Sequence, residues 1–358
     1  MRPLRIATYN VEWFTQLFGN DNRLLTDREW SARYNVTRGD QADALGIVFT
    51  AMDADGVMII EGPNHGHRRD TVLALENFAR FYQLRTSRAV MGFANDSHQE
   101  IAFLYDPARI QARHDPRGGG ERDALGARAR APRFDTSFYF DIDVDAVPEL
   151  IRFSKPPLEL AVEADGRSLR LIGVHAKSKA PHGANTPEEE MRIAIDNRRK
   201  QLAECVWLRR RVDEHLAAGD SVMVMGDFND GPGLDYYEAL FGHSGIEIVL
   251  GQNCGPEMKL HDPNADLALV RKPAITPTSA RFWLDNQKRY FEAMLDYIMV
   301  SPDLAARKPA WRIWHPLNDP GCLKVPELRD ALLAASDHFP VSIDIDLTGP
   351  SSRPASSL

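Results

Sequence analysis

The stretch Val222-Met223-Val224-Met225-Gly226-Asp227-Phe228-Asn229-Asp230 carries the strongest structural signal in the chain. Its apolar first half predicts a buried strand, and the glycine and polar residues that follow mark where that strand ends. Asp227 and Asn229 are two positions apart, so in an extended chain both side chains point to the same side. Carboxylate and amide oxygens suit a hard cation or a phosphate bound to it. Because Asp and Asn are also common where an ordinary strand turns, this motif alone leaves both interpretations open.

Similar short runs of apolar and β-branched residues recur along the whole chain, and each predicts a strand. They cover residues 4–9, 56–60, 99–105, 158–162, 169–174, 221–225, 294–300 and 340–347. Helical spacing of apolar residues predicts a long helix over 187–216 and shorter helices over 71–81 and 234–241. Strands therefore outnumber helices and do not alternate regularly with them. This pattern favours two β-sheets packed face to face with helices outside, and argues against a doubly wound parallel sheet.

The domain organisation expected from the sequence is one domain over residues 1–347 followed by a disordered tail over 348–358. Two segments are expected to be surface insertions. Residues 113–133 are polar and rich in arginine, and residues 255–277 carry four prolines.

The composition is 43% apolar and 26% charged, which is typical of a soluble globular protein. No apolar run approaches the roughly 20 residues of a membrane span, and the N-terminal segment does not resemble a signal peptide. Three widely separated cysteines argue against a disulfide framework, so a cytoplasmic location is expected. The net charge of −8 does not suggest a protein that holds long nucleic acid over its whole surface. Two arginine-rich segments, 109–133 and 191–211, are either ordinary solvated surface or a basic rim that attracts a phosphorylated substrate.

Other predicted strands also end in polar side chains that could carry chemistry. The residues at or next to these ends are Asn10, Glu61, His175, Asp296 and the pair Asp337-His338. Histidine can exchange a proton near neutral pH. An aspartate inside an apolar strand, as at position 296, is costly to bury unless a partner such as a histidine satisfies it. Chance could supply one or two such strand ends, but the full set predicts one site at the rim of a sandwich.

The motifs follow one another in the order Tyr-Asn-Val-x-Trp at 9–13, the glutamate at 61, the histidine at 175, Gly-Asp-Phe-Asn at 226–229, Leu-Asp-Tyr-Ile at 295–298 and Ser-Asp-His-Phe-Pro-Val at 336–341. This ordered set resembles the endonuclease/exonuclease/phosphatase superfamily. The resemblance runs from about residue 4 to residue 347, and its histidine-x-Lys-Ser-Lys stretch at 175–179 is similar to the bacterial nuclease-like branch. It implies an α/β fold: a four-layer α/β sandwich of two face-to-face, mostly antiparallel β-sheets flanked by helices. It also implies metal-dependent hydrolysis of phosphodiester or phosphomonoester bonds, assisted by Mg²⁺ or Mn²⁺.

The resemblance further implies roles for individual residues. Glu61, with Asn10 and Asp337, would hold the metal. Asp227 and Asn229 would position the attacking water and a phosphate oxygen, and His338, oriented by Asp296, would act on the water or bind the phosphate. His175 would lie near the leaving group, paired with Glu100 on an earlier strand. Lys155 and Lys177 would face substrate phosphate, although Lys177 could equally be a solvated loop lysine. The sequence departs from the family pattern at Ile60, where many members carry glutamine before the metal glutamate.

Several interpretations remain at this point. A nuclease acting on DNA or RNA is the leading one, ahead of a phosphodiesterase or phosphatase for a small or lipid-derived phosphate, which the acidic net charge favours. A catalytically inactive binding module is disfavoured because no expected site residue is missing. A calcineurin-type two-metal site is disfavoured because its Asp-x-His and Gly-Asn-His blocks are absent. A second metal site at His65 and His67 is disfavoured relative to a loop. The tryptophans Trp207, Trp283, Trp311 and Trp314 are expected to pack in the interior and not to stack on bases.

Overall fold

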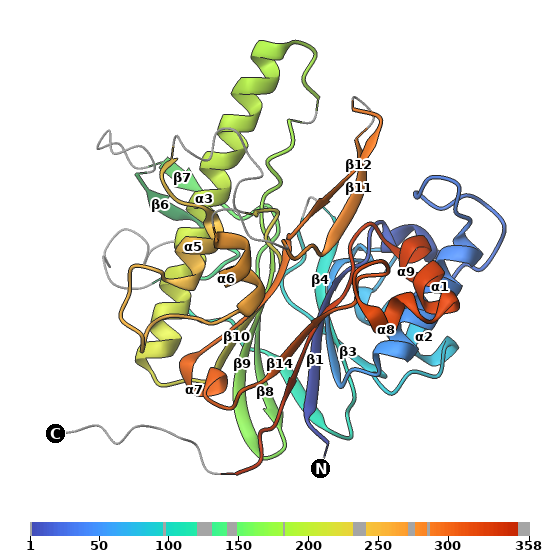
Figure 1. The fold of residues 1–358 in the computed structure, drawn as a ribbon, viewed down its shortest axis with the longest axis horizontal. Coiled ribbons are helices and arrows are strands. Elements are labelled where there is room, and N and C mark those ends of the chain that lie inside the picture. The colour runs from blue at the N-terminus through green and yellow to red at the C-terminus, as the bar shows by residue number, and fades with distance from the viewer. Residues whose placement is uncertain are drawn as a thin grey trace.

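The computed structural model describes residues 2–95, 98–119, 131–141, 149–181, 183–231, 241–270, 276–284 and 287–349. Within these residues two large sheets lie face to face, as Figure 1 shows. The six-stranded sheet has the order β14-β15-β1-β2-β4-β3. Its strands are β1 (Leu4–Asn10), β2 (Gly56–Gly62), β3 (Arg88–Met91), β4 (Glu100–Tyr105), β14 (Ala310–Ile313) and β15 (Val341–Ile345).

The five-stranded sheet has the order β13-β10-β9-β8-β5. Its strands are β5 (Ile110–His114), β8 (Leu158–Ala164), β9 (Arg167–His175), β10 (Val222–Asp227) and β13 (Asp296–Val300). In the two sheets the pairs β1–β2 and β9–β10 are parallel and the other pairs are antiparallel. Two short ribbons complete the described strands: β6 (Phe138–Phe140) with β7 (Glu149–Ile151), and β11 (Ala280–Leu284) with β12 (Arg289–Ala293).

Helices cover the outer face of each sheet and complete four layers (Figure 1). The six-stranded sheet is covered by α1 (Arg38–Met52), α2 (Thr71–Phe81), α9 (Pro326–Ala335) and the short elements η1 (Phe14–Leu17) and α8 (Pro320–Leu323). The five-stranded sheet is covered by α3 (Pro187–Ala217), α5 (Gly245–Leu250) and α6 (Pro263–Leu269), while α7 (Pro302–Ala305) follows β13. The expected four-layer sandwich of mostly antiparallel sheets is confirmed. The described residues contain no helix long and apolar enough to cross a membrane.

The alternation of side chains along buried strands accounts for the layers. In β2, Val57 and Ile59 pack into the outer helical layer, whereas Met58 and Ile60 pack between the sheets. Because both faces are covered, such strands are continuous apolar runs. This is why the sequence marks them so clearly.

The sequence predicted strands better than helices. The long helix over 187–216 and the helix over 71–81 are confirmed, whereas α1 and α9 were not predicted. Arg38–Met52 contains two glycines and a diffuse distribution of apolar residues, so its helical period is weak. The predicted helix over 234–241 lies almost wholly outside the described residues, as do most of the Asp-rich segment at 141–145 and the tail from residue 350.

The two predicted surface insertions are only partly accounted for. The prediction for 255–277 is wrong in its middle, because Leu260 and Ala265 are fully buried and α6 lies within the segment. Asp262 begins that helix as its N-cap and also accepts the Ile298 N–H at 2.9 Å, which ties the segment to the five-stranded sheet. Of the segment 113–133, residues 120–130 lie outside the described residues, and its first two residues end strand β5.

Candidate active site

The predicted site residues meet at one end of the two sheets. The carboxyl ends of β1 and β2 lie together in one sheet because the two strands are parallel, as do those of β9 and β10 in the other sheet, and the hydrogen bond from Asn10 to Asp227 joins the two pairs of ends. The antiparallel neighbours β13 and β15 begin at that edge. Opposite Asp227 in the register stand His175 on one side and Asp296 on the other. The six strand ends that were separate signals in the sequence therefore form one cluster.

Asp227 lies at the centre of this cluster and is 1% exposed. Its Oδ2 accepts hydrogen bonds from Asn10 Nδ2 at 3.0 Å and from Asn229 Nδ2 at 3.2 Å, and its Oδ1 accepts the Asn229 N–H at 2.7 Å. Burial raises its pKa above that of an ordinary carboxyl, while the His338 charge lowers it in part. A carboxyl of this kind can exchange a proton closer to neutral pH than an exposed aspartate can.

The backbone before Asp227 requires a glycine. Gly226 has φ of 141°, and a Cβ at this position would lie 1.9 Å from the Val174 carbonyl oxygen. Asn229 has φ of 48°, a left-handed conformation that asparagine tolerates better than most residues. The Gly-Asp-x-Asn order thus has a conformational reason in addition to its chemistry.

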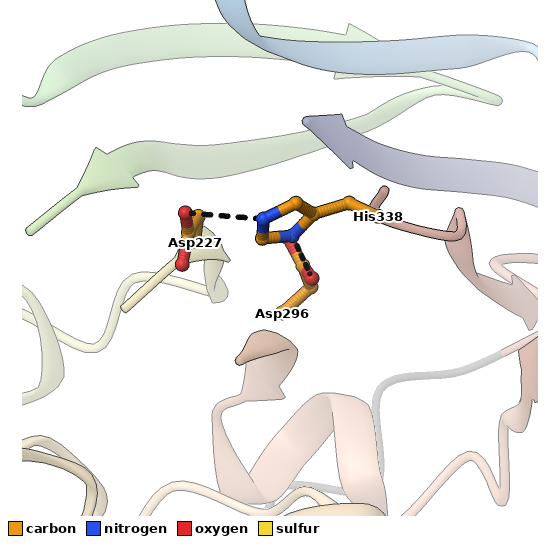
Figure 2. A group of neighbouring side chains, drawn as sticks. All are labelled: Asp227, Asp296 and His338. Carbon is orange, nitrogen blue, oxygen red and sulfur yellow. Dashed lines mark hydrogen bonds and ion pairs between the residues drawn. The ribbon is translucent and has the colours of Figure 1, made fainter. Parts of the chain in front are cut away.

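His338, Asp296 and Ser279 form a hydrogen-bonded chain beside Asp227. His338 Nδ1 lies 2.7 Å from Asp296 Oδ2, the same oxygen that accepts the Ser279 hydroxyl at 2.8 Å. Figure 2 shows the imidazole held between the two aspartates, with its Nε2 4.0 Å from Asp227 Oδ2. Burial alone would lower the pKa of His338, but the charges of Asp296 and Asp227 outweigh it and raise that pKa well above its usual value. The predicted pairing of His338 with Asp296 is present.

Ser279 was not predicted from the sequence. Its Oγ also accepts the backbone N–H groups of Leu295 and Asp296, at 3.0 and 2.9 Å, so it fixes the position of the carboxylate behind His338. It precedes β11, in a stretch without recognisable periodicity. Only the tertiary fold brings it to the start of β13.

His175 lies on the other side of Asp227, with its Nε2 3.7 Å from Asp227 Oδ2 and 4.0 Å from Glu61 Oε1. Burial, reinforced by the charges of Lys155 and His338, lowers its pKa well below the usual value, so the ring is neutral. The predicted pairing of His175 with Glu100 is wrong, because His175 Nδ1 is buried without a hydrogen-bond partner in the part of the chain that the structure describes.

Glu100 instead accepts hydrogen bonds from Asn95 Nδ2 at 2.8 Å and from the His65 N–H at 3.4 Å. It pairs with Gly62 beyond a register shift between β2 and β4. Burial raises the pKa of Glu100 to about 7. His65 and His67 are both exposed in the loop after β2, as the loop interpretation expected.

The carboxylate of Glu61 is held by a neighbour that the sequence did not reveal. Its Oε2 accepts Gln99 Nε2 at 2.6 Å and the Trp13 N–H at 3.4 Å. Glu61 and Gln99 both have φ of 61°, at the irregular pairing of β2 with β4. Burial and the nearby charge of Asp337 raise the pKa of Glu61, against the lowering effect of His338. Position 60, where the resemblance leads one to expect glutamine, is isoleucine. Gln99, directly before the adjacent strand β4, donates to Glu61 instead.

The oxygen atoms in this cluster suit a divalent cation. Within the residues that the structure describes, Asn10 Oδ1 is buried without a hydrogen-bond partner, while the amide nitrogen of Asn10 donates to Asp227. Glu61 Oε1 and Asp337 Oδ1 each lie 4.0 Å from one of the two histidines that flank Asp227. Oxygen ligands of this kind are those that Mg²⁺ and Mn²⁺ prefer. Among the described residues, one ligand atom each of Asp227, Asp296 and His338 lie within 4.8 Å of one another. Since Asp296 and His338 already bind each other, the set around Asn10 is the better donor set for a hard cation.

Lysine side chains lie along the five-stranded side of the site. Burial lowers the pKa of Lys155, while the carboxylates of Glu61 and Asp227 act in the opposite direction. The loops that carry Lys155 and Lys177 are both tied to Glu204 of α3, which accepts the Ser154 N–H at 3.2 Å and the Lys177 N–H at 2.8 Å. Burial raises the pKa of Glu204 to about 7. This glutamate was not predicted to belong to the site, and a charged residue on the buried face of the helix was its only sequence signal.

The comparison with protein families now has a structural basis. Residues 7–338 match the model of the Endonuclease/Exonuclease/phosphatase family, and the chain belongs to that family. Members are hydrolases that act on phosphoesters, and they typically use divalent metals. A search of curated proteins found no match.

Solved structures with a similar fold include proteins of different activities. The endonuclease domain of the telomere-specific retrotransposon TRAS1 shows 12% identity and a TM-score of 0.43, covering 97% of this chain and 100% of its own. An AP endonuclease from Archaeoglobus fulgidus shows 11% identity and a TM-score of 0.47, covering 96% and 100%. The mannosyl-6-phosphatase of Bacteroides thetaiotaomicron has the same values, with 11% identity, a TM-score of 0.47 and coverage of 96% and 100%. These similarities concern the fold and leave the substrate open.

Proposed function

We propose that this protein is a divalent-metal-dependent phosphodiesterase, and that its substrate is a nucleic acid. The observation that carries the proposal is the position of Asp227, hydrogen-bonded to two asparagines and flanked by the two histidines at 3.7 and 4.0 Å. Few structural roles would require this many polar groups to converge on one buried carboxylate. The proposed catalytic unit is the single domain over residues 1–347.

In the proposed reaction Asn10, Glu61 and Asp337 would hold Mg²⁺ or Mn²⁺. When bound, the cation would neutralise charge on the phosphate. Asp227, with its raised pKa, accepts a proton from the attacking water, and Asn229 orients that water. The water oxygen forms a bond to phosphorus as the bond to the leaving alcohol breaks.

The remaining residues stabilise the transition state. The protonated imidazole of His338 donates from Nε2 to a phosphate oxygen, and Asp296 and Ser279 fix its orientation through Nδ1. Lys155 and Lys177 supply further positive charge, and neutral His175 lies on the leaving-group side. Glu100 acts on this side only indirectly, because its contacts are with Asn95 and His65.

The test is hydrolysis of an aryl phosphodiester by the purified protein with Mg²⁺ or Mn²⁺. Asp337→Asn and His338→Ala should each reduce the rate by about 10²- to 10⁴-fold, as loss of one positioned catalytic group does. Folded variants with wild-type rates would refute the site assignment, and full activity in excess chelator would refute the metal requirement.

A second candidate is a phosphodiesterase or phosphatase for a small or lipid-derived phosphate, which the net charge of −8 favours. A panel of single- and double-stranded DNA, RNA, sphingomyelin, inositol phosphates and nucleotides separates the two. Absence of turnover on every member, with metal present, would favour an inactive binding module.

A further inference from the structure

The ribbon β11–β12 rises directly from the candidate active site. The Arg281 N–H donates to the Asp337 carbonyl at 2.7 Å, and Ala280 forms a β-bridge with His338. Ser279, immediately before the ribbon, donates to Asp296. Figure 1 shows the ribbon projecting beyond the same end of the sheets as the first turns of α3. The base of the ribbon therefore adjoins the candidate active site.

The two faces of the ribbon differ. The register places Phe282 opposite Phe291, and these rings turn inward onto the small cluster around Leu295. The other face carries Trp283 opposite Tyr290, which are 49% and 53% exposed. The expectation that Trp283 packs in the interior is thus wrong. An aromatic pair this exposed is unusual unless it meets a partner.

The exposed rings are ordered by their neighbours. Trp283 and Tyr290 pack edge to face, with centroids 5.1 Å apart and an interplanar angle of 71°. The Arg281 guanidinium lies 3.5 Å from the centroid of Tyr290 and pairs with Glu292 at 3.2 Å. Because these contacts already restrict the two side chains, less side-chain conformational entropy is lost when a ligand stacks on the rings.

The aromatic face is connected to the site through Arg281. Its guanidinium lies 3.5 Å from the centroid of Tyr290, and its backbone N–H donates to the carbonyl of the proposed metal ligand Asp337 at 2.7 Å. In the five-stranded sheet Lys155 precedes β8 and Lys177 follows β9, and both lysines offer positive charge for phosphates.

We propose that Trp283 and Tyr290 form a stacking platform for the bases of a single-stranded nucleic acid whose backbone crosses the active site. The proposal rests on the proposed phosphodiesterase function and names its substrate class. Every base has a flat π-face, so exposed aromatic rings next to a cationic site bind single strands with little dependence on sequence. In a duplex the base faces are stacked on one another and are closed to such rings.

A lipid surface fits the ribbon less well. The sequence between its two strands, residues 285–288, reads Asp-Asn-Gln-Lys, which is polar, whereas membrane insertion needs apolar residues. The Arg281–Glu292 ion pair lies on the aromatic face itself. Both features favour a ligand that combines flat rings with charge.

The test measures binding of a fluorescently labelled oligothymidylate to the full chain by anisotropy, in chelator to prevent cleavage. A labelled abasic oligonucleotide of the same length serves as the comparison probe. Trp283→Ala and Tyr290→Ala should each weaken oligothymidylate binding by about 5- to 150-fold, from the usual contribution of one stacked base. Binding of the abasic probe should not change, and Trp283→Phe should restore most of the loss because it keeps a ring.

The matched control is Phe81→Ala, which removes a ring that is 55% exposed at the end of α2, outside the ribbon. Equal weakening of both probes would overturn stacking in favour of a charge or folding effect. Unchanged oligothymidylate binding by Trp283→Ala and Tyr290→Ala would overturn the platform outright. If the same two variants instead lost binding to sphingomyelin vesicles, the ribbon would bind a lipid surface and the platform would likewise be overturned. Aryl phosphodiester hydrolysis is scored separately, so failure of the proposed function is distinguishable from failure of the platform.

Discussion

Replacing Asp296 with asparagine tests the chain that orients His338. The Asp296 carboxylate receives His338 Nδ1 at 2.7 Å and is 1% exposed, so its charge acts on the imidazolium with little solvent screening. A hydrogen bond between charged groups of this kind contributes about 1.5–3 kcal/mol. Since one pKa unit corresponds to about 1.4 kcal/mol, Asp296→Asn should lower the pKa of His338 by about 1–2 units.

The direction of the expected effect follows from the charge states. Asp296 and Asp227 raise the pKa of His338, so removal of one negative charge lowers that pKa. If protonated His338 binds the phosphate, activity is lost when the imidazolium deprotonates. The alkaline limb of kcat/KM against pH should therefore move to lower pH by about 1–2 units.

The assay is the pH profile of aryl phosphodiester hydrolysis at saturating metal, from about pH 5 to pH 10, which spans the titration range of histidine. The control is Asp330→Asn, which removes an exposed carboxylate of α9 that pairs with its neighbour Arg329. An unchanged alkaline limb in a folded Asp296→Asn variant would refute the role of protonated His338. A limb that moves to higher pH would refute the electrostatic reasoning itself.

Three further substitutions test the supports of the site. Gln99→Ala removes the 2.6 Å hydrogen bond to Glu61 and should weaken Mg²⁺ or Mn²⁺ binding by about 10- to 100-fold in calorimetric titrations. The kcat at saturating metal should stay nearly unchanged, and an unaltered metal affinity would contradict the role of Gln99. Glu204→Gln leaves one side-chain oxygen, which can satisfy only one of the part-buried N–H groups of Ser154 and Lys177. Denaturant unfolding should therefore show a free energy of unfolding lower by about 1–3 kcal/mol. Equal stability would contradict the role of the carboxylate. Gly226→Ala places a Cβ 1.9 Å from the Val174 carbonyl oxygen and should lower the free energy of unfolding by more than about 4 kcal/mol in the same measurement. A wild-type unfolding midpoint would show that the backbone adapts.

The buried strands were predictable because their signal is local, whereas the edge strands β3, β5 and β14 and the two short ribbons were not predicted. Buried strands such as β2 and β10 are continuous apolar runs that end in glycine or a polar residue, whatever packs against them. Helix α1 was missed because its helical period is weak and tertiary packing against α9 and the sheet stabilises it. The buried middle of 255–277 was missed because its prolines suggest a loop, whereas Pro263 is at the start of a helix, where proline is tolerated.

The candidate site divides in the same way. The sequence by itself determined which residue types stand at strand ends, because Asn10, Glu61, Asp227 and the Asp337-His338 pair each follow or precede an apolar run. In the sequence the glycine before Asp227 marked the end of a strand, whereas the reason for a glycine there, φ of 141°, is visible only in the structure.

Only the tertiary structure decided which of these residues touch and what supports them. Ser279 and Gln99 reach Asp296 and Glu61 from other segments, through a ribbon that begins at the site and through an irregular strand pairing. Next to the irregular pairing of β2 with β4, Glu100 accepts a hydrogen bond from Asn95, and not from His175 as had been predicted. The physical reason is that periodicity and spacing report which way a side chain points within its own element. The partner that it meets depends on strand register and on segments distant in the chain.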